Sequence, residues 1–273
     1  MSARAAKPIA PQVAKRLEAL FSQYHRPELI SPDPLECVLR YDSIADREVV
    51  ALIAATVAFG RVPHILRSID LLLPKLGAHP SAWLLKHPPA EIKKACSGWR
   101  HRWATGEEMA NLLCAARSVI REHGSLGAAW TDSLRQDDAD ALDTLIRWVG
   151  LLDQHGLEAD NSLLPRPERK SASKRLHLYL RWMIRKDAVD PGGWNDSPSR
   201  LLFPLDVHMH RIATALGATR RRAADLATTR EITAWFRRIA PTDPVRFDFA
   251  LTRLPIHDGL TTPEIHATLL RAE

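Results

Sequence analysis

Two residues of the sequence have side chains that could do covalent chemistry together. Lys174 begins one apolar segment and Asp206 begins a second, after a turn-rich link too short to form another domain. An amine becomes a nucleophile once it loses its proton, and burial or a positive neighbour such as Arg175 lowers the pKa of a lysine. A nearby carboxylate can take that proton or stabilise a cationic transition state. The pattern therefore predicts an amine–carboxylate pair, provided the two helix starts meet.

Both residues also have simpler explanations. Aspartate is a preferred N-cap residue, so Asp206 can cap the helix predicted over residues 207–216. Lys174 can be a solvated or phosphate-facing side chain. Spacing alone favours the cap for Asp206.

The elements that must position this pair are helices. Apolar residues recur at helical spacing, most of the 19 prolines lie between such segments, and Asp-Gly or Gly-Asn turns between alternating runs are missing. The sequence therefore predicts an all-α protein. Besides the helices of the pair and one that begins near Pro63, helices are expected at residues 12–24, 46–59, 107–123, 125–135, 139–153, 229–239 and 244–254.

The segment at residues 46–59 is apolar on nearly every face after an acidic cap at Asp46, which is typical of a helix in the middle of a bundle. Gly60 is expected to be its left-handed C-cap. The last helix is expected to stop before Pro255.

The composition is that of a globular protein with a basic surface. Of the 273 residues, 45% are hydrophobic and 26% charged, and 38 Lys and Arg against 32 Asp and Glu give a net charge of +6. A basic excess fits an acidic partner such as nucleic acid. Residues 1–11 are expected to be a disordered tail and residues 12–273 a single unit. No segment has membrane-spanning length, so we expect a soluble, cytoplasmic monomer.

No metal site is predicted. Cys37, Cys96 and Cys114 are too far apart in sequence to form a metal-binding pair, and we expect reduced thiols in the core. His208 and His210 are two positions apart on a helix, which directs them to different sides.

The segment Pro-Leu-Asp206-Val-His-Met-His-Arg-Ile-Ala-Thr-Ala-Leu-Gly, with Lys174 upstream of it, resembles the signature of the helix-hairpin-helix DNA glycosylase superfamily. It is most similar to the archaeal 8-oxoguanine DNA glycosylase branch and to an uncharacterised bacterial family of the same layout. The resemblance implies two helical lobes around a cleft that holds Lys174 as Schiff-base nucleophile and Asp206 as assisting carboxylate. It also implies base excision repair of duplex DNA, in which a damaged purine such as 8-oxoguanine is excised with associated lyase chemistry.

The resemblance also suggests where DNA would be held. A base flipped out of the duplex needs an aromatic-lined pocket, although core packing is the alternative for every candidate. The candidates for this base pocket are Trp103, Trp194 and Phe249, with Asp248 as reader of the base edge. The candidates for contacts with the DNA backbone are Arg61, Lys170, Ser171, Ser173, Arg175, His208 and Arg211.

Two features depart from the superfamily pattern. The hairpin turn before Lys174 has no glycine, although a Gly-rich turn usually grips a phosphate there. No cysteine lies beyond Cys114, so we expect no iron-sulfur cluster. Two alternatives to a glycosylase therefore remain. One is a non-catalytic DNA-binding protein that kept the fold, and the other is a scaffold for a protein partner.

Overall fold

The chain folds almost entirely into helices. The computed structural model describes residues 9–257, 259–261, 264, 265 and 267, and its named strands there are two of two residues each. This confirms the prediction of an all-α protein. None of the helices in these ranges has the length and apolar character needed to cross a membrane. The α-helices are α1 (Pro11–Tyr24), α2 (Leu35–Val38), α3 (Ile44–Thr56), α4 (Val62–Leu72), α5 (Pro80–Lys86), α6 (Pro89–Cys96), α7 (Gly106–His123), α8 (Leu126–Asp132), α9 (Ala141–Gln154), α10 (Lys174–Ile184), α11 (Val207–Ala215), α12 (Leu226–Arg237) and α13 (Asp248–His257).

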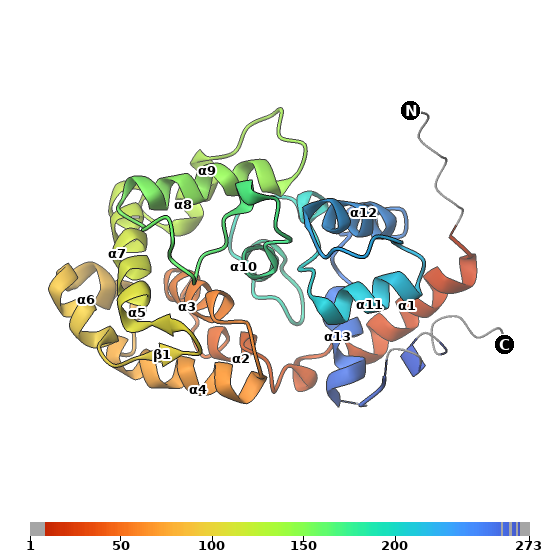
Figure 1. Ribbon diagram of the computed structural model, residues 1–273, viewed down its shortest axis with the longest axis horizontal. Helices are drawn as coiled ribbons and strands as arrows, with labels where there is room; N and C mark the ends of the chain where they lie inside the picture. The colour runs from red at the N-terminus through yellow and green to blue at the C-terminus, as the bar shows by residue number, and fades with distance from the viewer. Residues whose placement is uncertain (1–8, 258, 262–263, 266, 268–273) are drawn as a thin grey trace.

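Helix α10 lies between two groups of helices. Figure 1 shows α2 to α9 on one side of it and α1 with α11 to α13 on the other. Helix α1 packs against α13, and α10 packs against α3. The residues of α10 from Leu176 to Ile184 are all buried. Helix α10 is therefore the centre of the molecule, and its first residue, Lys174, lies where the two groups meet.

Helix α1 begins inside the segment that the sequence predicts to be disordered. Of the predicted disordered segment at residues 1–11, residues 1–8 lie outside the described ranges. Pro11 already belongs to α1, at a position of the first turn where the missing N–H of proline has no helical partner to lose.

Helix α3 is buried on all faces, as its sequence predicts. The residues from Val49 to Thr56 are buried without exception. The prediction that Asp46 caps this helix is wrong, because the N-cap residue is Ser43 and Asp46 lies inside the first turn. The buried Asp46 carboxylate accepts a hydrogen bond from the backbone N–H of Ser81 at 2.9 Å, at the start of α5. Asp46 thus satisfies a free amide of a neighbouring helix.

Glu48 does the same for α8. Its carboxylate accepts hydrogen bonds from the backbone N–H groups of Leu126 and Gly127, at 3.1 and 2.9 Å, and from the Trp194 indole at 2.8 Å. Burial raises the pKa of Glu48, although these donors act in the opposite direction. A side chain at Gly127 would place its Cβ 2.6 Å from the Glu48 carboxylate, so the close approach requires glycine.

Two predicted helix ends are wrong. Helix α3 ends at Thr56, and Gly60 lies in the following loop with a φ of 100°. Arg175 donates to the carbonyl oxygen of Thr56 at 2.8 Å, so a glycine cap is not needed to satisfy that helix end. Helix α13 runs through Pro255 to His257, so the helix continues for two residues beyond the proline that was expected to stop it.

A short hairpin was missed because two-residue strands show no alternation in sequence. Arg100–His101 pairs with Ala104–Thr105 across a turn in which Arg102 has a φ of 54°. The buried His101 ring contacts the Ser68 hydroxyl at 2.8 Å and the Phe59 carbonyl oxygen at 2.9 Å. The hairpin is therefore fastened to α4 and to the loop between α3 and α4.

His177 makes α10 sensitive to acid. Its side chain is buried, neither ring nitrogen has a hydrogen-bond partner among the described residues, and burial lowers its pKa to about 4. The unfolded chain therefore takes up a proton near pH 6.5 that the folded protein accepts only near pH 4. Stability should be full above pH 6.5 and fall with decreasing pH, by a few kcal/mol in total. Urea unfolding of the wild type and His177→Leu between pH 7 and 5 measures this.

The His177→Leu variant should lose this pH dependence. His64→Leu, which removes an exposed imidazole from α4, is the matched control and should retain it. An equal pH dependence in wild type and His177→Leu would contradict the assignment.

Candidate active site

The structure brings Lys174 and Asp206 together. The Lys174 ammonium Nζ lies 3.1 Å from the Asp206 carboxylate Oδ2, with side-chain exposures of 32% and 29%. Lys174 is the first residue of α10 and Asp206 is the N-cap residue of α11. Two helix starts thus meet at a site that is half-buried and open to solvent.

Asp206 uses its two oxygens for two different contacts. Oδ1 accepts a hydrogen bond from the backbone N–H of Met209 at 2.9 Å, which is the helix cap, while Oδ2 faces Lys174. Burial acts to raise the pKa of Asp206, but the Lys174 charge and the Met209 N–H outweigh it and hold the pKa below its usual range. The cap and the charge pair are therefore properties of one carboxylate rather than alternatives, and the cap fixes its orientation.

The turn before Lys174 is made without glycine. Lys170 and Ser173 have positive φ angles of 60° and 43°, which L-residues rarely adopt. The turn is held by pairing with the start of α12. The N–H of Leu226 donates to the Lys170 carbonyl oxygen at 3.1 Å, and Ser171 forms an isolated antiparallel β-bridge with Asp225. The left-handed positions that glycine would fill are thus occupied by residues held in place from α12.

Arg175 is not free to bind a DNA phosphate, contrary to expectation. Its guanidinium donates to three backbone carbonyl oxygens, those of Thr56 and Leu163 at 2.8 Å and that of Ser162 at 3.0 Å. Burial lowers its pKa to about 10. Arg175 therefore joins the start of α10 to the end of α3 and to the segment before the turn.

The other candidates for DNA contacts divide by exposure. Ser173 is buried with its hydroxyl 3.0 Å from that of Ser171, so its backbone position matters more than its side chain. Ser171 is exposed on the turn. The remaining candidates are all exposed, namely Arg61, Lys170, His208 and Arg211.

The four base-pocket candidates are not brought together. Trp103 is 57% exposed at the hairpin turn, with its ring stacked on Phe59 at 4.8 Å between centroids. Trp194 is buried against Glu48 and lines a cavity of about 380 Å³ to which neither Lys174 nor Asp206 contributes. Trp194 therefore belongs to a cavity that the amine does not line, and Trp103 lies on the surface rather than in a pocket.

Asp248 and Phe249 are buried in a charged network below the pair. Asp248 forms an ion pair with Arg181, and the Arg253 guanidinium lies 4.4 Å from the Phe249 ring centroid. Burial raises the pKa of Asp248, and the charge of Asp206 raises it further. Asp248 therefore lies within electrostatic reach of the candidate site, but its position in the interior does not suit a reader of a base edge.

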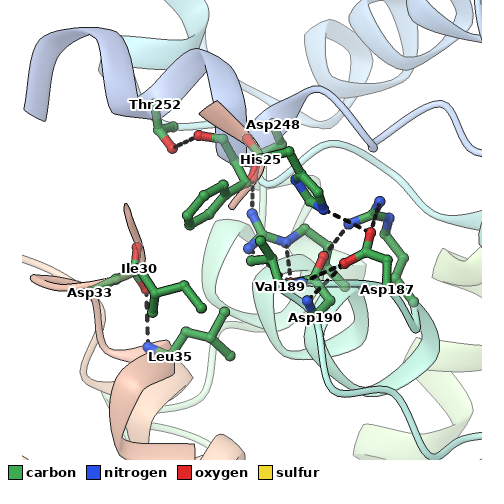
Figure 2. A network of polar contacts seen from close by, with 12 residues as sticks. His25, Ile30, Asp33, Leu35, Asp187, Val189, Asp190, Asp248 and Thr252 are labelled. Carbon is green, nitrogen blue, oxygen red and sulfur yellow. Dashed lines mark hydrogen bonds and ion pairs between the residues drawn. The ribbon is translucent and has the colours of Figure 1, made fainter. Parts of the chain in front are cut away.

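Asp190 is the centre of this network (Figure 2). Its two oxygens accept hydrogen bonds from Arg181, in the last turn of α10, and from Arg185, the C-cap residue of that helix. Arg185 also contacts Asp243 at 2.9 Å and Asp187 at 2.6 Å. Burial acts to lower the pKa of both arginines, but the aspartates outweigh it and raise the pKa values. The network fixes α10 to α13 and to the segment after α10.

The sequence contained one sign of this network. Arg181 and Arg185 are four residues apart on a helix whose other faces are apolar, and such a spacing places both on one face. No signal identified Asp190 or Asp248 as their partners. In the described ranges, no group of three or more His, Cys, Asp or Glu side chains could hold a metal ion.

Comparison with known proteins identifies a family but no activity. The model of a family described as "Protein of unknown function (DUF2400)" matches residues 33–257. No curated protein and no solved structure matches the chain. The matched range contains α2 to α13, and with them Lys174, Asp206 and the buried network.

Lys170 provides a test of the strained turn. Glycine adopts a positive φ without the steric penalty of a Cβ, so Lys170→Gly should be more stable than Lys170→Ala by about 0.5–1 kcal/mol. Chemical denaturation of the two variants measures the difference. The same exchange at Glu168, exposed and at an ordinary φ, should favour alanine. A preference for alanine at both positions would contradict the left-handed conformation of Lys170.

Asp206 can be tested for its two contacts separately. Asparagine caps helices as well as aspartate does, so Asp206→Asn should be about as stable as the wild type, while Asp206→Ala should lose about 1 kcal/mol. Because the folded pKa of Asp206 is below 3.8, the advantage of wild type over Asp206→Ala should be full above that pH and shrink as the pH falls through the folded pKa. Denaturation at pH 7 and pH 3 checks both statements. Equal losses in the two variants would show that the cap contributes nothing.

Proposed function

The chain belongs to the DUF2400 family, and we propose that it is a DNA glycosylase with lyase activity that excises a damaged purine through Lys174. The observation that carries the proposal is the 3.1 Å contact between the Lys174 amine and the Asp206 carboxylate at two helix starts. The proposed fold is correspondingly of the helix-hairpin-helix glycosylase type. The arrangement of α10, the preceding turn and α11 supports it.

The proposed reaction begins with attack of the neutral Lys174 Nζ on C1′ of the damaged nucleotide. The C1′–N9 bond breaks, its electron pair leaves with the purine, and the purine takes a proton from water. The O4′–C1′ bond then breaks, O4′ takes the second proton of the attacking nitrogen, and a Schiff base joins Lys174 to the opened sugar. Water then takes a C2′ proton from this intermediate, the electron pair forms a C2′–C3′ double bond, and the C3′–O bond breaks to release the 3′ phosphate, which is the lyase step.

Asp206 has two roles in this scheme. It stays ionised while the C1′–N9 bond breaks, and it then receives the first proton that the attacking nitrogen loses, since it is the carboxylate in contact with the amine. Its lowered pKa keeps it ionised at neutral pH, so a negative charge faces the positive charge that develops on the sugar. The Met209 N–H prevents the carboxylate from turning away as the amine becomes neutral.

The surroundings of the pair support DNA as the substrate. Lys170 lies on the exposed turn before α10, and His208 and Arg211 are exposed on α11, so exposed basic side chains lie beside the starts of both helices of the site. The chain as a whole carries a net charge of +6. Such groups would neutralise phosphates and make binding weaken with salt. We propose 8-oxoguanine as the first damaged purine to test.

Lys174 can be tested without knowing the lesion. A duplex with one abasic site already exposes the sugar aldehyde, so the wild type should form a covalent adduct with it that borohydride reduces and traps. Lys174→Ala should form none, and Lys174→Arg should form none while still binding the duplex, because it keeps the charge but not the nucleophile. Electrophoresis of the trapped products, with peptide mapping of the modified residue, measures this.

Asp206→Asn separates the two steps of the reaction. It should still be trapped on the abasic duplex but release 8-oxoguanine at least about 100-fold more slowly, because the carboxylate is needed while the glycosidic bond breaks. A wild type that binds duplex DNA in a salt-sensitive manner without any adduct would instead support a non-catalytic DNA-binding protein. Absence of duplex binding at low salt would remove DNA from the proposal.

A further inference from the structure

Trp103 is much more exposed than the other tryptophans of the chain, which are buried or partly buried. All eight tryptophans lie in the described ranges, and Trp103 is 57% exposed whereas the rest are buried or partly buried. A large ring at the surface exposes apolar area to water, which folding does not explain. Its position at the turn of the hairpin makes it project from the molecule.

The ring is also rigidly mounted. Phe59 stacks on it with centroids 4.8 Å apart and an interplanar angle of 25°. His101 holds the base of the hairpin through the Ser68 hydroxyl and the Phe59 carbonyl oxygen. A side chain held this way loses little conformational entropy when a partner covers it. Trp103 is therefore preorganised for contact.

The charges around Trp103 select an anionic partner. The Arg102 guanidinium lies 4.7 Å from the Trp103 ring centroid. Arg100 and Arg61 are exposed on the hairpin and on the adjoining loop. An aromatic ring among arginines is a combination that binds nucleic acid, in which the ring stacks on a base and the arginines face phosphates.

Trp103 is connected to the candidate active site through stacked groups. The Arg175 guanidinium lies 4.9 Å from the Phe59 ring centroid, on the side of the molecule where Arg175 adjoins Lys174 in the chain. Trp103, Phe59 and Arg175 thus form a continuous series of stacked groups that ends at the first turn of α10, one residue along the chain from Lys174. A duplex bound with one nucleotide at Lys174 would meet the hairpin next to the opened position.

From these contacts we infer that Trp103 stacks on the bases beside the nucleotide that is opened at Lys174, and stabilises the gap left in the duplex. The inference rests on the proposed function, since it takes the duplex to be opened there. It assigns Trp103 a place outside the base pocket, in contact with the undamaged part of the DNA. Unstacked bases at such a gap are the partners that a protruding aromatic ring can bind.

The test compares affinities for two duplexes of the same sequence, one intact and one with a single abasic site. Trp103→Ala should bind the abasic duplex about tenfold more weakly than the wild type, since base–aromatic stacking contributes about 1–3 kcal/mol. Its affinity for the intact duplex should stay within about twofold, because phosphate contacts dominate there. Trp103→Phe should retain most of the affinity for the abasic duplex.

Leu71→Ala is the matched control. Leu71 is 55% exposed at the C-terminal end of α4, so the variant removes a similar apolar surface away from the hairpin and should bind both duplexes like the wild type. A 2-aminopurine placed opposite the abasic site reports stacking directly. Its emission should be quenched by the wild type and by Trp103→Phe, and much less by Trp103→Ala at saturating protein. Thermal unfolding confirms that the variants are folded.

The outcomes separate the two proposals. If borohydride traps the wild type on the abasic duplex but Trp103→Ala changes neither the affinity ratio nor the emission, the stacking role is overturned and the lysine chemistry stands. If Trp103→Ala weakens both duplexes equally, Trp103 is a general DNA contact and the stacking role is again overturned. A selective loss without any wild-type adduct would support the stacking role and overturn the lysine chemistry.

Discussion

The charges that α10 carries into the interior constrain the whole structure. Arg181 and Arg185 are buried, and an unpaired buried charge would cost several kcal/mol. Asp190 pairs with both arginines, and Asp248 pairs with Arg181 and so brings α13 against the same helix. Helix α10 can therefore rotate or slide only if this network breaks, so the position of its first residue is fixed by contacts near its last one.

The start of α10 is fixed by a different kind of contact. Arg175 has no carboxylate partner among its hydrogen bonds and instead satisfies three backbone carbonyl oxygens that would otherwise be free. The left-handed residues of the preceding turn are held by pairing with the segment before α12. Lys174 thus sits between two fixed points, with α3 on one side and α11 on the other. Such placement, more than the chemistry of lysine alone, would let the Lys174 amine act at a defined atom in the proposed reaction.

Local patterns predicted the elements better than they predicted the contacts between them. The start of α11 at Asp206 and the burial of α3 follow from capping preference and apolar periodicity, which are properties of neighbouring residues. The roles of Asp46 and Glu48 could not be found this way, because each caps a helix that lies far along the chain. Arg175 was misread for the same reason, since its exposure depends on carbonyl groups that only the fold brings near it. A basic residue in a sequence indicates charge, but not whether that charge faces solvent.

Stability alone does not explain why Lys174 and Asp206 form a pair. An ion pair exposed by about a third contributes little to folding, and the cap contact of Asp206 would persist without the lysine.

The buried network around Asp190 offers an electrostatic reason for the position of the Lys174–Asp206 pair. Three arginines pair there with five aspartates, so the carboxylates are in excess; the arginines are Arg181, Arg185 and Arg253, and the aspartates are Asp33, Asp187, Asp190, Asp243 and Asp248. Asp248 lies close enough for its pKa to respond to Asp206 and Lys174. A positive charge that develops on a sugar at Lys174 would therefore be stabilised by Asp206 in contact and by this negative excess behind it. The same arrangement that fixes the helix would favour the proposed transition state.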